Sequence, residues 1–357
     1  MLTNKPRFPV KSILLHGWLP SPIKKLLYRL KGYHVGRGTK LCFGSVIEGE
    51  DVAIGDDSSL GFFTIVRGKS ISIGKRVSIG AMSILDTPEL EVGNDTKINE
   101  QVFVGGLQNP DSSLKIGYNC QIQQWTFINP FKRITIGHDT SIGGHSLIFS
   151  HHSWLNIFDG YMADFRPIEI GNNVGIAWRV FIGAGSKIGD GSLVGANSLV
   201  NRTIPPKSLA MGTPAKVVAK APVFPRNVSA DEKVGMLTQI MGDFQDFLIG
   251  HEFQCESSEN FRTIKVRRKN GGSNSGWTMK VCFKPEEGDE SAISEKGLDV
   301  CLSLCSISEK NRLAFDSGNT LWLDIQKGQR ANLSNDFGEE VVNYLKRYGV
   351  RFTRECE

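Results

Sequence analysis

The stretch IGAGSKIGDGSLVGANSL, residues 182–199, is three consecutive copies of one six-residue unit. Each copy begins with an aliphatic residue followed by glycine and carries serine at its fifth position. Outward from this stretch the unit recurs in ten further places, beginning at Ile54, Leu60, Ile73, Ile79, Val92, Ile116, Ile136, Ile142, Ile170 and Ile176. A period sustained this often indicates a repeat architecture.

A six-residue period has a specific physical meaning. Three units make one triangular coil, in which the aliphatic residue points to the axis and the small fifth residue packs at a corner, while Gly, Asp and Asn allow tight turns. Stacked coils pair their short strands and share one continuous core. About 180 residues at roughly 18 per coil predict nine or ten coils. Stretches of 3.6-residue period are missing between the units, which excludes a helical bundle and a Rossmann fold.

Length and composition suggest a large and a small domain. The chain has 357 residues, of which 40% are hydrophobic, and most of its 39 glycines lie before residue 220. We expect a lead-in with a short helix at 1–34, the repeat domain at 35–220, a proline-bearing linker at 221–228 and a small α+β domain at 229–357.

The lead-in helix is expected over Ser21–Leu30. Its apolar residues share one face and its basic residues the other, namely Ile23, Leu26, Leu27 and Leu30 against Lys24, Lys25, Arg29 and Lys31. Packing against the end of the repeat domain is the favoured role. Peripheral contact of the basic face with anionic lipid is the alternative.

The C-terminal region loses the six-residue period and shows no catalytic triad or metal-ligand spacing. Its patterns predict helices and strands, namely helices at 231–249 and 339–348 and strands at 263–266, 277–283, 299–304 and 320–325. Loops are expected at 269–276 and 285–297. The role of this domain is open: it lengthens an acceptor cleft or binds a partner.

Charge and cysteine content narrow the function classes. The net charge is +5 and the basic residues are spread out, which gives no support to nucleic-acid binding. Seven cysteines without CxxC spacing argue against a disulfide framework or a zinc knuckle. No N-terminal apolar run reaches the length of about 18 residues that a membrane helix requires. We therefore expect a cytoplasmic protein without a transmembrane segment.

The period breaks at residues 149–168, which must leave the prism as a loop. The loop begins with adjacent histidines, His151 and His152, and its apolar residues need a partner surface, namely Trp154, Leu155, Ile157, Phe158, Tyr161, Met162 and Phe165. Loops on a rigid scaffold commonly carry chemistry. Two shorter departures, 105–114 and 129–134, are either bulges at coil corners or places that hold an acceptor.

Three motifs resemble the sugar and xenobiotic O-acetyltransferase branch of the hexapeptide-repeat proteins. They are Ser150-His151 before the loop, Arg166-Pro167-Ile168-Glu169-Ile170-Gly171 after it, and Gly212-Thr213-Pro214-Ala215-Lys216-Val217-Val218 at the end of the repeats. The 19-residue step from His151 to Ile170 is similar to that of maltose-type O-acetyltransferases. The resemblance covers roughly residues 36–220 and implies a left-handed parallel β-helix.

The resemblance also implies a site and an assembly. It implies a homotrimer with sites between subunits, acetyl-CoA as acyl donor and no metal. His151 is the expected catalytic residue, and His152 orients it, contacts substrate or only packs. Candidates for binding coenzyme A are Ala177, Trp178, Ala184, Ala196, Ser198, Arg202, Thr213, Pro214 and Lys216. Candidates for binding the acceptor are His145, Trp154, Asp164 and Arg166.

Chemistry supports the histidine independently. Acylation of a sugar hydroxyl by a thioester requires removal of a proton from an alcohol of high pKa, which a neutral imidazole does near neutral pH. The other ring N–H needs an acceptor that fixes the tautomer. The sequence leaves five choices: Asp139, Asp159, Asp164, Glu169 or a backbone carbonyl.

The leading function is therefore an acetyl-CoA-dependent O-acetyltransferase on a sugar hydroxyl, in a cell-surface or extracellular polysaccharide or a lipopolysaccharide precursor. An amino-sugar N-acetyltransferase is the nearest alternative. A metal enzyme similar to the γ-class carbonic anhydrases requires His138, His145 and His151 to converge on one zinc ion. A non-catalytic scaffold or binding protein is the third class.

Overall fold

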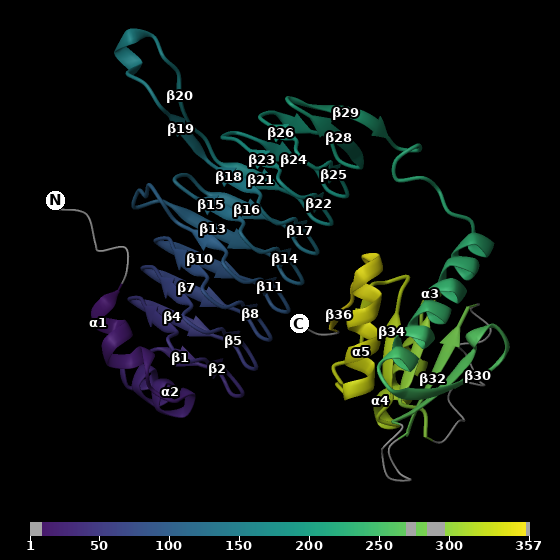
Figure 1. The fold of residues 1–357 in the computed structure, drawn as a ribbon. Coiled ribbons are helices and arrows are strands. Elements are labelled where there is room, and N and C mark those ends of the chain that lie inside the picture. Colours follow the sequence, from purple (N-terminus) through teal and green to yellow (C-terminus); the bar gives the residue numbers. More distant parts are fainter. Residues whose placement is uncertain (1–8, 269–275, 284–296, 355–357) are drawn as a thin grey trace. The chain divides into compact units, whose positions relative to one another are not determined.

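The computed structural model describes residues 9–268, 276–283 and 297–354 (Figure 1). It divides into two compact units, Met1–Arg226 and Asn227–Glu357. The two loops expected at 269–276 and 285–297 fall almost entirely outside the described residues. Within the described ranges, no helix combines the length and the apolarity needed to cross a bilayer.

The hexads fold into a prism with three sides, each a sheet of short parallel strands (Figure 1). Successive strands go to faces A, B and C in turn. Face A comprises β1 His34–Val35, β4 Asp51–Ile54, β7 Ser70–Ile73, β10 Glu89–Val92, β13 Ser113–Ile116, β16 Ile134–Ile136, β21 Ile168–Ile170, β24 Lys187–Ile188 and β27 Thr203–Ile204.

Face B comprises β2 Lys40–Leu41, β5 Ser59–Leu60, β8 Ser78–Ile79, β11 Lys97–Ile98, β14 Gln121–Ile122, β17 Ser141–Ile142, β22 Gly175–Ile176, β25 Leu193–Val194 and β28 Ser208–Gly212, and ends with the antiparallel β29 Ala215–Lys220. Face C comprises β3 Val46–Glu48, β6 Ile65–Arg67, β9 Ile84–Asp86, β12 Phe103–Val104, β15 Phe127–Asn129, β18 Leu147–Phe149, β23 Phe181–Ile182 and β26 Leu199–Val200. The predicted left-handed β-helix class is confirmed.

The register keeps equivalent hexad positions in line. Ile54 pairs with Ile73, and Ile170 pairs with Ile188, so the aliphatic first residues stack along the axis. These side chains are buried in one continuous core. The small fifth residues are buried as well: the Ser58 hydroxyl donates to Gly74 O over 2.7 Å in the next coil. The expected roles of both positions are confirmed.

The three corners of the prism are named by the faces they join: A-to-B, B-to-C and C-to-A. All long departures from the hexads lie at the C-to-A corner, because they follow a face C strand and precede a face A strand. They are the insertion at 105–112 after β12, the segment 130–133 after β15, and the loop after β18. Corners can accept such insertions because the strand ladders on the faces are not interrupted.

The N-terminal segment is more helical than expected. It contains α1 Val10–Ser12, the π-helix Ile13–Gly17 and α2 Ser21–Leu30, of which only α2 is predicted by the sequence. α2 packs against the first coil of the repeat domain, as the favoured prediction states, but with a residue of its basic face inward and not with its apolar face. Lys24 is buried, and its Nζ donates to Cys42 O over 2.6 Å and to Ser45 O over 3.0 Å.

Burial lowers the pKa of Lys24 to about 8. Tyr28 is also buried and accepts from Ile47 N over 3.0 Å. The carbonyls of the first coil therefore draw a lysine inward, and the helix turns its apolar residues Leu26 and Leu30 to the outside, 59% and 75% exposed.

The second unit is a small α+β domain around a sheet of seven strands in sequence order. Its helices are α3 Ala230–Gly250, α4 Glu309–Ser317 and α5 Asp336–Leu345. Its strands are β30 Phe253–Ser257, β31 Thr263–Arg268, β32 Gly276–Cys282, β33 Val300–Ser303, β34 Leu321–Asp324, β35 Gln329–Arg330 and β36 Thr353–Arg354. The two helices and four strands expected from the sequence are present, whereas β30, α4, β35 and β36 are not predicted by it.

Candidate active site

The loop after β18 begins at a buried serine that ties it to the coil below. The Ser150 hydroxyl accepts from Lys132 N over 2.8 Å and donates to Asn129 O over 3.2 Å. Both partners lie at the C-to-A corner of the preceding coil. His151 therefore starts from a fixed backbone position even though the hexads stop there.

The loop is an antiparallel ribbon that projects from the prism (Figure 1). Strand β19 His151–Ser153 pairs with β20 Ala163–Phe165, so that His151 lies opposite Phe165 and His152 opposite Asp164. At the tip, Asn156 accepts from Phe158 N over 3.1 Å and begins the 3-10 turn Ile157–Asp159.

The ribbon exposes its large apolar side chains. Trp154, Phe158 and Met162 are 81%, 91% and 81% exposed within the single chain. Scattered exposed apolar residues are ordinary, but a contiguous set of this size marks an interaction site. The sequence predicts that these side chains pack against a partner surface, and in the single chain they are not covered by one.

His151 sits among three phenylalanine rings at the base of the ribbon. The ring centroids of Phe131, Phe149 and Phe165 lie 5.5, 6.1 and 6.4 Å from that of His151. Burial, and secondarily the charge of His152, lower the pKa of His151 below its ordinary value of 6.5. Its neutral form is thus favoured near neutral pH, which is the form that accepts a proton.

The tautomer of His151 is not fixed within one chain. Its Nδ1 is buried and has no hydrogen-bond partner among the described residues. The four carboxylates considered from the sequence are engaged elsewhere, as Asp139 accepts from Asn119, Asp159 from Asn156, Asp164 from Arg166, and Glu169 pairs with Lys187.

The chain returns to the prism through an ion pair. Arg166 donates Nε to Asp164 Oδ1 over 2.6 Å and makes a second, shorter bond to the other carboxylate oxygen. The hydrogen bond from Arg166 lowers the pKa of Asp164. Arg166 lies over Gly185 of the next coil, where a Cβ would be 2.5 Å from the guanidinium carbon. The predicted acceptor contacts Asp164 and Arg166 therefore lie at the same corner as His151.

Two predicted acceptor contacts remain: Trp154 follows β19 in the exposed part of the ribbon, whereas His145 lies at a different corner. It occupies the B-to-C turn between β17 and β18, with its ring 4.7 Å from that of Trp125 and 6.0 Å from that of Trp178. Trp178 in turn covers Gly144, where a Cβ would lie 2.7 Å from the indole. Within one chain the strands of face C separate this aromatic corner from His151.

Some of the residues predicted to bind coenzyme A lie at the corners of the prism or in the last hairpin, and others are buried in the prism. Ala177, Trp178 and Ala196 lie at the B-to-C corner, and Arg202 lies at the C-to-A corner with His151. Ala184 and Ser198 are buried, and the Ser198 hydroxyl accepts from Gly212 N over 3.0 Å. The β28–β29 hairpin carries the remaining three at or beside its turn: Thr213, Pro214 and Lys216.

The three histidines of the zinc alternative occupy three different corners. His138 stacks on Tyr118 at the A-to-B corner with ring centroids 3.9 Å apart, His145 is at the B-to-C corner, and His151 is at the C-to-A corner. In the ranges that the structure describes, no group of three His, Cys, Asp or Glu side chains is placed to hold a metal. The chain therefore does not assemble the ligand set that this alternative requires.

Phe131 is a site residue that the sequence did not assign. The sequence marks the segment 129–134, which has bulky residues where small ones are usual, as a bulge or a place that holds an acceptor, but it does not single out Phe131. The structure places the Phe131 ring 5.5 Å from His151 and 5.0 Å from Phe165. Its bulk is the signal that could have found it.

Comparison with known proteins gives partial matches. Galactoside O-acetyltransferase of Escherichia coli K12 is 44% identical over 78 residues, which are 22% of this chain and 36% of that protein. WbbJ of the same strain, provisionally named a lipopolysaccharide biosynthesis O-acetyl transferase, is 33% identical over 113 residues, 29% of this chain and 58% of that protein. The chain thus spans about a third and somewhat over half of these relatives (36% and 58%).

No profile of a known protein family matches the chain. Among solved structures, the hexapeptide-repeat acetyltransferase VCA0836 of Vibrio cholerae, complexed with acetyl coenzyme A, is 20% identical, covers 59% of this chain and 84% of that chain, and has a TM-score of 0.26. The resemblance to hexapeptide-repeat acetyltransferases that the sequence predicts is confirmed by the names of the curated relatives.

Proposed function

We propose that this chain, a relative of hexapeptide-repeat acetyltransferases, transfers an acetyl group from acetyl-CoA to a hydroxyl group of a saccharide, with His151 as the general base. The observation that carries the proposal is the placement of His151, half-buried among three aromatic rings at the base of the ribbon. The names of the curated relatives support the acetyl group and the sugar acceptor. A polysaccharide or lipopolysaccharide precursor is the proposed acceptor class.

The chemistry follows from the protonation state of His151. Its neutral imidazole accepts the proton of the acceptor hydroxyl while the oxygen forms its bond to the acetyl carbon and the carbon–sulfur bond breaks. The imidazolium then returns the proton to the departing thiolate. The phenyl rings of Phe131, Phe149 and Phe165 keep water away from the imidazole, which holds its pKa low enough for this role.

Acetyl-CoA supplies the activated acetyl group. The small side chains of Ala177 and Ala196 leave the B-to-C corner open to a thin pantetheine arm, and Trp178 stands beside them as a wall. Arg202, Lys216 and Thr213 are exposed and are proposed to hold the phosphates and the nucleotide. These residues follow the ribbon along the prism.

Within a single chain, His151 and the B-to-C corner lie on opposite sides of face C, so a second copy of the chain is needed to bring them together. We place the C-to-A corner of one subunit against the B-to-C corner of its neighbour in a homotrimer. The apolar ribbon, with Trp154 and Phe158 exposed, then gains the surface it lacks. Closed rotational symmetry gives three identical sites.

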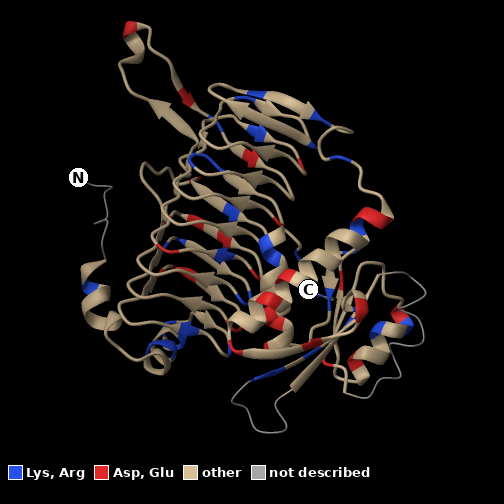
Figure 2. Cartoon of the chain, turned by 45° about the vertical axis from the view of Figure 1, so that its right-hand side comes forward, with Lys and Arg blue, Asp and Glu red and all other residues tan. Residues whose placement is uncertain are grey.

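Peripheral membrane contact is proposed for the N-terminal helices. Leu14, Leu15, Leu26 and Leu30 are exposed by 64%, 69%, 59% and 75%, and Lys and Arg residues occur in the same helices (Figure 2). A helix that carries apolar and basic residues outward is suited to the surface of an anionic bilayer.

The test of the activity is thiol release from acetyl-CoA with a panel of saccharides, compared between the wild type and His151→Ala. We expect kcat/KM to fall at least roughly a hundredfold in the variant, the scale of general base catalysis. The exposed His34 of face A supplies the matched control His34→Ala, which should keep full activity.

Unchanged turnover in His151→Ala would show that His151 is not the general base. If only the amine-bearing saccharides in the panel are acetylated, the enzyme is an N-acetyltransferase and not an O-acetyltransferase. If no saccharide stimulates thiol release from the wild type, the enzyme function itself is wrong and a binding role is left.

A further inference from the structure

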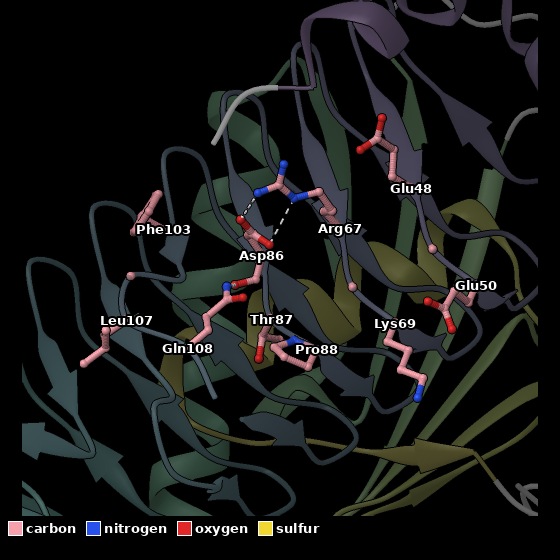
Figure 3. A pocket seen from close by; sticks show the side chains of 13 residues that line it. Glu48, Glu50, Arg67, Lys69, Asp86, Thr87, Pro88, Phe103, Leu107 and Gln108 are labelled. Atoms are coloured by element: carbon pink, nitrogen blue, oxygen red, sulfur yellow. Dashed lines mark hydrogen bonds and ion pairs between the residues drawn. The ribbon is translucent and has the colours of Figure 1, made fainter. Parts of the chain in front are cut away.

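A cavity of about 700 Å³ lies at the C-to-A corner, on the N-terminal side of His151 (Figure 3). Its walls come from the corner turns of successive coils and from the insertion at 105–112. Charged and polar side chains line it together with a few apolar ones, among them Glu50, Arg67, Lys69, Asp86, Phe103 and Leu107. None of the residues assigned to the acetyl transfer is part of it.

The cavity has a rigid floor. Arg67 pairs with Asp86 of the next coil over 2.5 Å and by a second bond of 3.2 Å. Gln108, from the insertion, donates to Asp86 O over 2.6 Å and holds the insertion across the cavity. A site whose walls are held in place before a ligand arrives loses little freedom on binding.

The cavity and His151 are joined by aromatic rings on the outside of face C. Phe103 lines the cavity, and its ring lies 4.8 Å from that of Phe127, which lies 4.8 Å from that of Phe149. Phe149 stacks on His151 with centroids 6.1 Å apart. The three phenylalanines lie on successive strands of face C, which are spaced about 5 Å apart. The insertion and His151 are therefore two strand spacings, or about 10 Å, apart along the prism axis.

The corner turns give a second connection. The insertion is tied to the following turn by Ser112, whose hydroxyl donates to Phe131 O over 2.9 Å, and by the ion pair of Asp111 with Lys132 at 2.9 Å. Asn129 is 6% exposed and packs against Gly106 of the insertion, and its Oδ1 has no hydrogen-bond partner in the described part of the chain. The insertion and the turn below His151 are therefore fixed to each other by a hydrogen bond, an ion pair and a close contact.

The charges decide the class of ligand. The cavity has three carboxylates and two cations in its lining. Arg67 and Asp86 neutralise each other, which leaves Glu48 and Glu50 against Lys69. This balance gives a polyanion no attraction, whereas paired polar groups beside an aromatic ring suit a ligand rich in hydroxyl groups and C–H faces.

We propose that the cavity binds an uncharged segment of the acceptor glycan, several sugar units away from the hydroxyl that is acetylated. The inference rests on the proposed function, because the glycan held in the cavity would have to extend along the aromatic rings of face C to reach His151. The groove gives the enzyme a preference for chains over single sugars, and the insertion at 105–112 is its selective wall.

The test uses the exposed wall, which can be changed without disturbing the prism core. The double variant Leu107→Ser/Gln108→Ala removes one apolar contact and the hydrogen bond that holds the insertion to Asp86, and Leu313→Ser on α4 is the control, since Leu107 and Leu313 are 53% and 65% exposed. We expect kcat/KM for neutral oligosaccharides to fall roughly ten- to thirtyfold in the double variant. That for the corresponding monosaccharides should not change.

A binding experiment separates this inference from the proposed function. The full chain and both variants are applied, without acetyl-CoA, to an array of neutral and acidic oligosaccharides. Neutral glycans bound by the wild type and the control but lost in the double variant support the groove, even if no acetylation is detected. Binding of acidic glycans alone, binding equal in all three proteins, or no binding at all overturns it.

Discussion

At the scale of the residue, His151 owes its protonation state to rings and not to a carboxylate. Phe131, Phe149 and Phe165 surround it, and its buried Nδ1 has no partner in the described chain. An imidazole with an unpaired buried nitrogen is costly to charge, because the cation has lost water and gained no acceptor. The same residues therefore favour the neutral base, and no side chain among the described residues fixes the tautomer through Nδ1.

This arrangement predicts the pH dependence of the reaction. Because burial lowers the pKa of His151, the acid limb of kcat/KM should have its midpoint below 6.5. His152→Gln removes the secondary cause, the like charge, and should move the midpoint upward but not past 6.5, since burial is unchanged. The measurement is a pH profile of kcat/KM for both proteins. A wild-type midpoint at or above 6.5, or a downward shift in the variant, contradicts the account.

The same shift affects stability with a definite sign. The folded-state pKa of His151 lies below the unfolded one, so the unfolded chain binds the proton more tightly. The stability of the prism should accordingly fall, not rise, as the pH is lowered through 6.5 toward the folded-state pKa.

Single residues show what a sequence can reveal. His151 is predictable because the hexads stop at Ile148, three residues before it. Phe131 is not, since its contact with His151 depends on which corner of the preceding coil the break falls on. The burial of Lys24 is not predictable either. Its charge suggests an exposed position, yet its Nζ donates to three oxygen atoms of the first coil.

At the scale of the element, α2 is the clearest departure from expectation. Its helical period is predictable, and its bounds Ser21–Leu30 are those expected. Which face turns inward is not, because it depends on the unpaired carbonyls at the open end of the β-helix. Lys24 donates to those carbonyls, Tyr28 accepts from the Ile47 N–H, and leucines are left outside.

The exposed face of α2 predicts membrane binding. Leu26→Ser/Leu30→Ser should lower the partition into vesicles of phosphatidylglycerol and phosphatidylethanolamine by roughly tenfold or more, because two leucines no longer enter the acyl region. The wild-type partition should decrease with added salt. Cosedimentation measures both, with Leu313→Ser as the exposed control. Equal binding to pure phosphatidylcholine, or no effect of the substitutions, shows that the face serves another partner.

The ribbon was also predictable only in part. The sequence shows that residues 149–168 leave the prism, but their antiparallel pairing is hidden because the two strands have only three residues each. Such pairing is not stable by itself and is supported by the anchors at its base, Ser150 and Arg166.

At the scale of the whole molecule, the proposed site is incomplete in one chain. His151 and Trp178 lie at different corners, with face C between them. If neighbouring subunits bring these corners together, two inactive variants can repair each other. Mixed trimers of His151→Ala and Trp178→Ala should regain about a quarter of the wild-type activity, the fraction of interfaces with both residues intact.

The experiment requires coexpression or refolding of the mixture and a mass from sedimentation equilibrium. The control is a mixture of His151→Ala with the double variant His151→Ala/Trp178→Ala, which has no intact interface and should stay inactive. Activity of the mixture equal to the mean of its components places the whole site within one chain, and a monomeric mass excludes the trimer.

The repeat unit was the part of this molecule most open to prediction from sequence. Its architecture follows from the hexads because each coil meets only its neighbours, so a local pattern determines a global shape. The small second unit was predicted less completely: β35 and β36 have two residues each and carry too little periodic signal. Of the proposed acceptor site, the sequence marks only the segment 105–114, as a bulge or a place that holds an acceptor. The other walls could not be foreseen, because they come from turns that are far apart in the chain.

The strand ladder keeps its register through very unequal stretches of chain. Ile136 pairs with Ile170 across a step of 34 residues, and Ile170 pairs with Ile188 across a step of 18. Corner segments can thus be lengthened or exchanged without any change in the stacked interior. The C-to-A corner is therefore the place where a single in-frame insertion can change the outer surface of this protein and leave the register of all three faces as it is.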